Sequence, residues 1–156
     1  MSAHSQFLSL FPGKVGAYLR AAFYRLALRH CDAHALISFG TILSQTDTSI
    51  GSGVYIGPQC NIGKCEIGND TLLGSGVHIM SGKQQHNFED LNTPIREQGG
   101  AFSLIRIGKD CWIGNGALIM ANVGDKSIVA AGSVVTSDVP AKSIVAGNPA
   151  KVVKCR

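Results

Sequence analysis

The stretch IGKDCWIGNGALIMANVGDKSIVAAGSVV, residues 107–135, carries the most regular pattern in this chain. Aliphatic residues recur in it at six-residue spacing, with one shorter step in the middle: Ile107, Ile113, Ile119, Val123, Val129 and Val135. Neither the 3.6-residue period of a helix nor the two-residue period of a strand explains this spacing. A chain that turns a corner every six residues does explain it, because each flat face then sends one aliphatic side chain inward. Three such faces make one coil of a parallel β-solenoid.

The same spacing continues upstream, between residues 37 and 79. The residues that share it are Ile37, Leu43, Ile50, Ile56, Ile62, Ile67, Leu73 and Ile79. Glycine directly follows many of them, as Gly108 and Gly114 do downstream. Glycine suits such corners because it is small and tolerates a positive φ. Steps of four, five and seven residues also occur, and we interpret them as tightened or bulged corners of the same solenoid.

Three short motifs near the C-terminus accompany these repeats: AGSVV (Ala131–Val135), Val139-Pro140 and AGNPAK (Ala146–Lys151). With the repeats, they resemble the hexapeptide-repeat acyltransferases, and most of all their O-acetyltransferase branch, over roughly residues 37–154. The resemblance implies an all-β fold, the left-handed parallel β-helix. It also implies acetyl-CoA as co-substrate and a homotrimer with its active sites at subunit interfaces.

The spacing predicts two regions outside the regular solenoid. Residues 1–36 are expected to form an N-terminal helical cap, with an apolar lead up to Pro12 and an amphipathic helix over about residues 13–30. This helix either covers the first coil's open edge or lies on an anionic membrane. On the resemblance, residues 37–156 are expected to form the left-handed β-helix acyltransferase domain, from which the polar residues 81–106 are extruded as one long loop.

Composition excludes several classes of protein. The formal charge of +4 is too small for the dense basic patch of a nucleic-acid binder. The five cysteines are odd in number and lack metal-ligand spacing, which favours free thiols in a reducing compartment. We find no signal-peptide pattern and no apolar run long enough to span a bilayer. We therefore expect a cytoplasmic protein.

His86 is the predicted general base. Transfer of an acetyl group to a hydroxyl requires a base for the hydroxyl proton and a donor for the developing oxyanion. The resemblance implies that the base is a histidine of the extruded loop, and His86 is the histidine that this loop contains. An ordinary loop histidine is the alternative. Glu89 or Asp90 would orient the imidazole, unless both are simply solvated, and His78 is expected to lie on the solenoid surface.

The remaining site residues follow from the resemblance. The backbone near Trp112 and Asn115 would hold the acyl carbonyl and the pantetheine arm, and an amide near Asn115 would support the oxyanion. The other positions expected to contact acetyl-CoA are Ala131, Thr136, Ser137, Lys151 and Lys154, the two lysines through its phosphates. Asn61 lies near an acceptor-side asparagine of the family. The alternatives are a subunit contact for Trp112, a corner role for Asn61 and solvation for the lysines.

The predicted function is therefore an acetyl-CoA-dependent O-acetyltransferase. It would move the acetyl group to a hydroxyl of a sugar or saccharide precursor by direct attack, because no serine or cysteine nucleophile stands in a recognisable setting. Serine or a xenobiotic as acceptor is the alternative within the class, and a non-catalytic scaffold subunit is the alternative outside it. A zinc enzyme on the same scaffold needs three converging histidines. Neither the pair His78 and His86 nor the pair His30 and His34 has a third, so we predict no metal.

Overall fold

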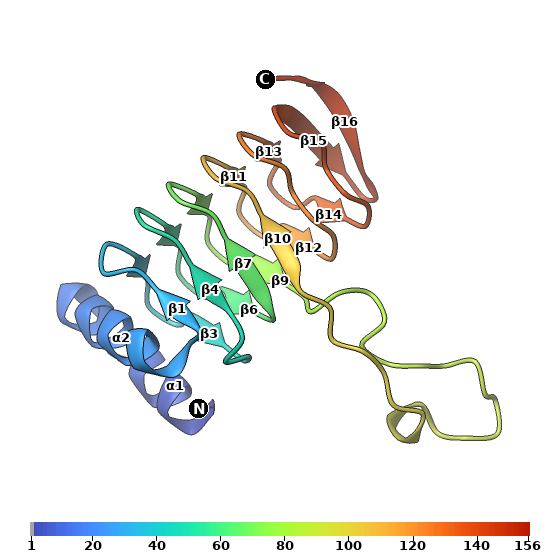
Figure 1. Ribbon diagram of the computed structural model, residues 1–156, viewed down its shortest axis with the longest axis horizontal. Helices are drawn as coiled ribbons and strands as arrows, with labels where there is room; N and C mark the ends of the chain where they lie inside the picture. The colour runs from blue at the N-terminus through green and yellow to red at the C-terminus, as the bar shows by residue number, and fades with distance from the viewer. Residues whose placement is uncertain (1) are drawn as a thin grey trace.

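The computed structural model describes residues 2–156, which form two helices followed by a three-sided β-solenoid of about six turns (Figure 1). Helix α1 spans Ser2–Ser9 and helix α2 spans Gly13–Ala27. Both lie at one end of the solenoid (Figure 1). The predicted β-solenoid, with its N-terminal helix and its extruded loop, is confirmed.

Three sheets of parallel strands form the faces of the solenoid. The first sheet contains β1 (His30–Cys31), β4 (Ser49–Ile50), β7 (Cys65–Ile67) and β10 (Ile105–Ile107). The second contains β2 (Leu36–Ile37), β5 (Tyr55–Ile56), β8 (Leu72–Leu73), β11 (Trp112–Ile113), β13 (Ile128–Val129), β15 (Ser143–Gly147) and the antiparallel β16 (Ala150–Cys155). The third contains β3 (Ile42–Leu43), β6 (Asn61–Ile62), β9 (His78–Ile79), β12 (Leu118–Ile119) and β14 (Val134–Val135).

The core is a stack of the aliphatic residues that the six-residue spacing selects. Every one of them, from Ile37 to Val135, is buried. Cys31 begins the first coil, and Val139 and Val145 add positions after the last predicted one. A second inward position, two residues before the aliphatic one, is filled by small side chains such as Ala35, Thr41, Cys60, Ala117 and Ser133. Large and small side chains therefore alternate in the narrow interior of the coils, which has no room for aromatic side chains.

Of the two corner roles predicted, a small residue or a positive φ, the glycines that follow the aliphatic residues fill the first. A Cβ atom on Gly114 would collide with the backbone nitrogen of Ala131, which lies in the next coil. The positive φ values occur two residues further on, at Gly116 (+66°) and Gly132 (+68°). These residues stack along one edge, where the Gly132 amide donates to the Asn115 carbonyl at 2.9 Å. Adjacent coils thus approach closely at one corner position and hydrogen-bond at another.

The N-terminal cap contains two helices where the sequence predicted a lead and one helix. Helix α1 ends against the buried guanidinium of Arg20, whose Nη1 donates to the carbonyls of Leu8 (3.1 Å) and Phe11 (2.7 Å). Its Nε donates to the carbonyl of Ile37 at 2.9 Å. A cation that satisfies the last carbonyls of a helix stabilises that helix end. Arg20 therefore links α1, α2 and the first coil, and β1 begins at His30, upstream of the predicted boundary at residue 37.

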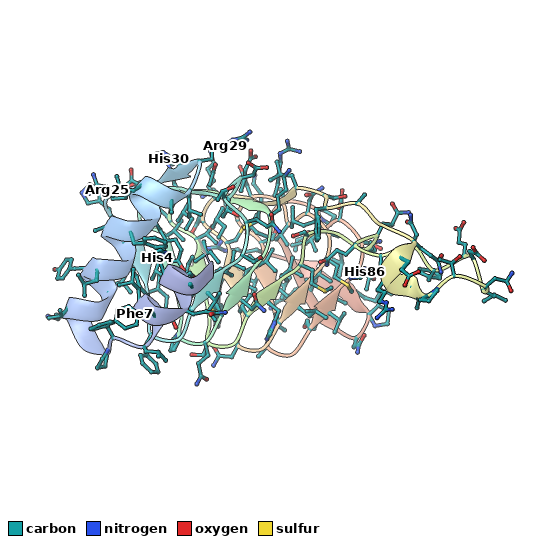
Figure 2. The ribbon with its side chains drawn as sticks, turned by 90° about the horizontal axis from the view of Figure 1, so that it is seen from below. His4, Phe7, Arg25, Arg29, His30 and His86 are labelled. Atoms are coloured by element: carbon teal, nitrogen blue, oxygen red, sulfur yellow. The ribbon has the colours of Figure 1, made fainter. Side chains whose placement is uncertain are left out.

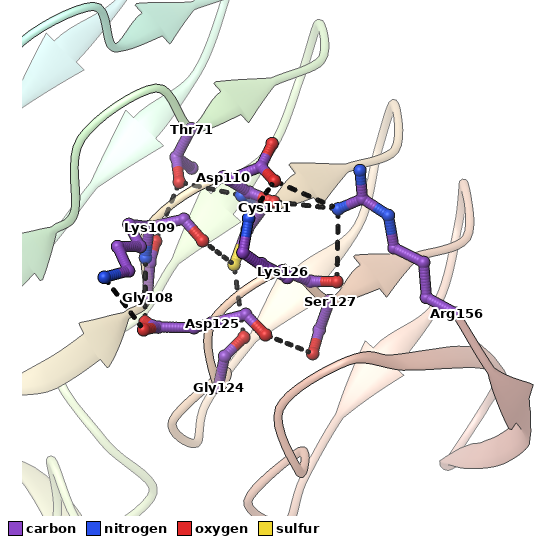
Figure 3. Close-up of polar contacts among 10 residues, drawn as sticks. All are labelled: Thr71, Gly108, Lys109, Asp110, Cys111, Gly124, Asp125, Lys126, Ser127 and Arg156. Carbon is purple, nitrogen blue, oxygen red and sulfur yellow. Dashed lines mark hydrogen bonds and ion pairs between the residues drawn. The ribbon is translucent and has the colours of Figure 1, made fainter.

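The C-terminal end of the solenoid is covered by β16, which pairs with β15. Arg156 extends from this hairpin to the edge between the first and second sheets (Figure 3). There its Nη1 donates to the carbonyls of Asp110 (3.1 Å) and Lys126 (3.2 Å). Lys126 donates to the Asp110 carboxylate at 3.0 Å, and this bond holds the pKa of Asp110 below its usual value. These contacts hold the hairpin over the last coils.

Candidate active site

The extruded loop, residues 80–104, leaves the solenoid at the edge between the third and first sheets, where it joins β9 to β10 (Figure 1). The two chain segments at its base run side by side. The Ser103 amide donates to the Ser81 carbonyl and the Ala101 amide to the Gln84 carbonyl, both at 2.8 Å. The Asn87 amide donates to the carbonyl of Gly99 at 2.9 Å. These bonds set the direction in which the loop leaves the solenoid.

Hydrogen bonds within the loop also order its outer part, which contains the short helix η1 (Ile95–Glu97). The Asp90 carboxylate accepts from the Thr93 hydroxyl (2.7 Å) and from the Asn92 amide (2.9 Å), which holds the pKa of Asp90 below its usual value. The Gln98 side-chain amide donates to the carbonyls of Asp90 and Thr93, each at 2.7 Å. Hydrogen bonds between residues of the loop thus give it a defined conformation of its own.

His86 is exposed on this loop, beside a hollow of about 680 Å³ lined by loop residues that include Lys83, Asn87 and Phe88. Figure 2 shows it on the side of the molecule that carries the loop, away from the helices. Within residues 2–156 no hydrogen bond or ion pair engages its imidazole. The orienting role considered for Asp90 is not seen, because Asn92 and Thr93 occupy that carboxylate.

A second hollow, of about 370 Å³, lies on the outer face of the third sheet. Asn61 and His78 are paired in register on its floor, with Leu118 next to them. Gln85 and Phe102 line it from the loop. Sequence reasoning selected Asn61 and left His78 on the surface, but it missed Gln85 and Phe102. An aromatic residue in an otherwise polar loop was the available signal for Phe102.

Asn115 and Ala131 occupy equivalent positions in adjacent coils, at the edge between the second and third sheets. In the described part of the chain, neither of their backbone amides donates to a carbonyl. The Asn115 side-chain oxygen accepts from the Ser75 amide at 3.0 Å, so this side chain joins two coils. Both amides thus lack a carbonyl acceptor among the described residues, and each lies against a glycine of the preceding coil, Gly74 or Gly114.

Trp112 and the two C-terminal lysines lie on the outer face of the second sheet. Trp112 is 55% exposed and stands in register between Leu72 and Ile128. Lys154 pairs with Ile144 and Lys151 with Ala146 along β15. Neither lysine has an ion-pair partner among the described residues. Both ammonium groups are therefore available to an anionic ligand.

Thr136 and Ser137 follow β14 at the edge where the loop leaves the solenoid. Ser137 lines a hollow of about 580 Å³ together with Lys83 and Gln84 of the loop base. The structure thus places His86, Thr136 and Ser137 on one edge and Asn115 and Ala131 on another. The third sheet separates the two groups, so one chain does not bring the predicted base and the predicted oxyanion donor together.

The cysteines offer no buried nucleophile. Desolvation raises the pKa of Cys31 to about 11 and that of Cys65 to about 12, and it also raises the pKa values of Cys60 and Cys111. These four thiols stay protonated at neutral pH, and a thiol is a poor nucleophile compared with its thiolate. Within the described residues, no three His, Cys, Asp or Glu side chains are grouped to hold a metal ion.

Two protein-family models match segments of the sequence. Residues 47–81 match the bacterial transferase hexapeptide with six repeats, and residues 104–137 match the hexapeptide repeat of succinyl-transferase. Both matches describe hexapeptide repeats of transferases, and they fall on the two regular blocks of the solenoid. No curated protein matches the sequence.

Solved structures share the fold of this hexapeptide-repeat protein. A hexapeptide-repeat acetyltransferase from Vibrio cholerae, complexed with acetyl coenzyme A, has a TM-score of 0.68 and 21% identity, over 99% of this chain and 84% of its own. A maltose O-acetyltransferase from Clostridium difficile has a TM-score of 0.65 and 22% identity, over 99% and 85%. A mutant of AntD, an N-acyltransferase from Bacillus cereus, has a TM-score of 0.65 and 21% identity, over 78% and 70%. It is complexed with dTDP-4-amino-4,6-dideoxyglucose and coenzyme A.

Proposed function

We propose that this protein is an acetyl-CoA-dependent O-acetyltransferase whose acceptor is a hydroxyl of a sugar or saccharide precursor. The observation that carries the proposal is His86. Its imidazole is exposed, has no partner among the described residues, and stands on an internally hydrogen-bonded loop beside a hollow of about 680 Å³. An imidazole without a partner has a ring nitrogen free to accept the proton of an acceptor hydroxyl, as a general base must.

The reaction is a direct transfer. His86 takes the proton of the acceptor hydroxyl while the hydroxyl oxygen attacks the thioester carbonyl carbon. The Asn115 amide donates to the oxyanion that forms, and a fixed donor of this kind costs no reorganisation during the reaction. The carbon–sulfur bond then breaks, and the protonated imidazole returns its proton to the leaving thiolate. The protonated state of the four buried cysteines supports this path over one with a cysteine nucleophile.

Acetyl-CoA would lie along the edge that carries Asn115 and Ala131. The unpaired Ala131 amide is a donor for the pantetheine arm, and Trp112 offers an apolar surface to the same arm. Thr136 and Ser137 would contact the cofactor across β14. Lys151 and Lys154 would bind its phosphates, because neither ammonium is engaged by a carboxylate within residues 2–156.

The acceptor would bind in the hollow of about 370 Å³ on the third sheet. Asn61, His78 and Gln85 supply amide and imidazole groups that can hydrogen-bond to hydroxyls. Phe102 supplies an apolar surface for the carbon face of a sugar ring. A few polar groups around an apolar wall are typical of a small-molecule site.

A homotrimer would complete this site. His86 lies on a different edge from Asn115 and Ala131, so a neighbouring chain must bring the two groups together. The outer face of the second sheet supplies a contact surface, since it carries an apolar row: Leu36, Tyr55, Leu72, Ile128 and Ile144. The first sheet is instead charged, with Arg106 donating to Glu66 at 3.1 Å. In a closed ring, each chain would contribute both edges to different sites.

Release of CoA thiol from acetyl-CoA tests this function. We expect thiol release with a saccharide acceptor such as maltose, and none with a matched amino sugar whose hydroxyls are blocked. Serine and an amphenicol test the alternative acceptors of the same class. Turnover of the amino sugar alone would make the protein an N-acyltransferase. If no acceptor of the panel supported turnover and calorimetry detected no heat of CoA binding, the protein would be a non-catalytic scaffold.

A further inference from the structure

Helix α2 is apolar on the side that faces solvent as well as on the side that faces the solenoid. Its inward residues are Gly16, Arg20 and Tyr24, all buried. Its outward residues follow the helical spacing of four, three and four positions: Val15, Leu19, Ala22 and Leu26. Of these, Val15 is 69% and Leu26 90% exposed. A helix that only capped the first coil would have a polar outer face.

Helix α1 and the turn that follows it extend this apolar surface. Phe7 is 63% and Leu10 67% exposed, and the rings of Phe7 and Phe11 lie 5.2 Å apart. Figure 2 shows Phe7 and Arg25 at the end of the molecule that the helices form. We call Phe7, Leu10, Phe11, Val15, Tyr18, Leu19 and Leu26 the outer cap face. Exposed apolar patches of this kind mark interaction surfaces.

The N-terminal segment that forms the outer cap face also carries the net positive charge of the chain. Residues 1–31 contain four basic residues and no acidic residue, whereas the rest of the chain has equal numbers of both. Arg20 is buried, which leaves Lys14, Arg25 and Arg29. Arg29 lies 3.9 Å from Glu66. Lys14 and Arg25 flank the outward stripe of α2 on the side of Tyr18, which is 75% exposed.

We propose that the outer cap face binds the surface of an anionic lipid bilayer, with α2 lying in the plane of the interface. Exposed leucine, valine and phenylalanine side chains enter the boundary between headgroups and acyl chains, and the flanking basic groups contact lipid phosphates. Tyr18 takes the interfacial position that its ring and hydroxyl favour. No helix of the described residues is long and apolar enough to cross the bilayer, so the contact is peripheral.

Charge favours a bilayer over a second copy of the chain as the occupant. Packing two outer cap faces together would bring like charges from Lys14 and Arg25 into one interface, which is unfavourable. An anionic surface complements the same charges and accepts the apolar stripe. The surface is remote from His86, and its lipid binding does not depend on the proposed catalytic function.

Vesicle flotation of the full chain tests the proposal. We expect it to float with phosphatidylcholine vesicles that contain about 30% phosphatidylglycerol and to remain unbound with pure phosphatidylcholine. The double variant Val15→Gln/Leu26→Gln should lose more than about tenfold in binding. In the double variant Lys14→Gln/Arg25→Gln, vesicle binding should fall roughly fivefold for each charge removed. The controls are Leu91→Gln, at a loop residue that is 95% exposed, and Lys109→Gln/Lys142→Gln. Both should bind as the unmodified chain does.

Three results would overturn the proposal. The first is absence of flotation, or equal flotation with both kinds of vesicle. The second is a loss in the loop control that matches the loss in the α2 variant. The third is a lipid-free sedimentation experiment in which the unmodified chain forms a larger assembly than Val15→Gln/Leu26→Gln, since the face would then be a contact between copies.

Discussion

Replacement of His86 with alanine is expected to lower kcat for acetyl transfer by at least about 10²-fold, the low end for loss of a general base. Thermal stability and CoA affinity should not change, because no described hydrogen bond or ion pair involves the imidazole and the residue is exposed. Steady-state thiol release gives kcat, thermal unfolding gives stability, and calorimetry gives the dissociation constant of CoA.

His78→Ala and His30→Ala are the matched controls for this measurement. His78 lines the proposed acceptor hollow, so its loss should act mainly through the KM of the acceptor. His30 is exposed on the first sheet and should have no effect. Full activity in His86→Ala, combined with loss of kcat in His78→Ala, would transfer the role of base to His78.

Replacement of Arg20 with alanine is expected to lower the free energy of unfolding by about 3–5 kcal/mol. The substitution removes a charged donor from the carbonyls of Leu8, Phe11 and Ile37 and leaves a cavity where three elements meet. Because Arg20 holds the end of α1, helical content should fall as well. Urea unfolding followed by circular dichroism gives both quantities.

Arg25→Ala is the control for this prediction. Arg25 belongs to the same helix but is exposed, so its loss should change the free energy of unfolding by less than about 0.5 kcal/mol. If the two variants unfolded at the same urea concentration, the position of α1 would not depend on Arg20.

The sequence predicted the solenoid well because the fold has one dominant physical signal. Each coil needs one buried aliphatic side chain per face, and every residue of the six-residue pattern is buried. Where the pattern stops, the chain leaves the solenoid as the extruded loop. The irregular steps proved to be corners of the same three sheets, since the strands on either side of them pair in parallel.

Long-range contacts explain what the sequence did not predict. Helix α1 lacks an acidic first turn and a basic last turn of its own, and its end is held by Arg20, more than ten residues away. The sequence predicted small or φ-tolerant residues at the corners without separating the two roles, because an approach of the next coil cannot be seen in one coil's sequence. The separation of His86 from Asn115 follows from which edge each residue occupies. A motif resemblance does not carry that information.

We propose that one active site uses His86 of one chain and the Asn115 amide of another. Asn115→Pro would remove that amide, and the backbone tolerates proline there, because Pro58 occupies the equivalent corner position two coils earlier. Its kcat should fall by about 10²–10³-fold, the range for an oxyanion donor. Asn115→Ala keeps the amide and loses only the bond to Ser75. It should therefore retain most of the activity.

Mixed oligomers of His86→Ala and Asn115→Pro chains, formed in equal amounts, show whether the two groups act across a subunit interface. Each variant alone should be nearly inactive. If each site takes its base and its oxyanion donor from different chains, random mixing gives about one quarter of the sites two intact partners. We predict recovery of about a quarter of the unmodified activity. A mixture no more active than the two variants measured separately would contradict a shared site, because both groups would then act within a single chain.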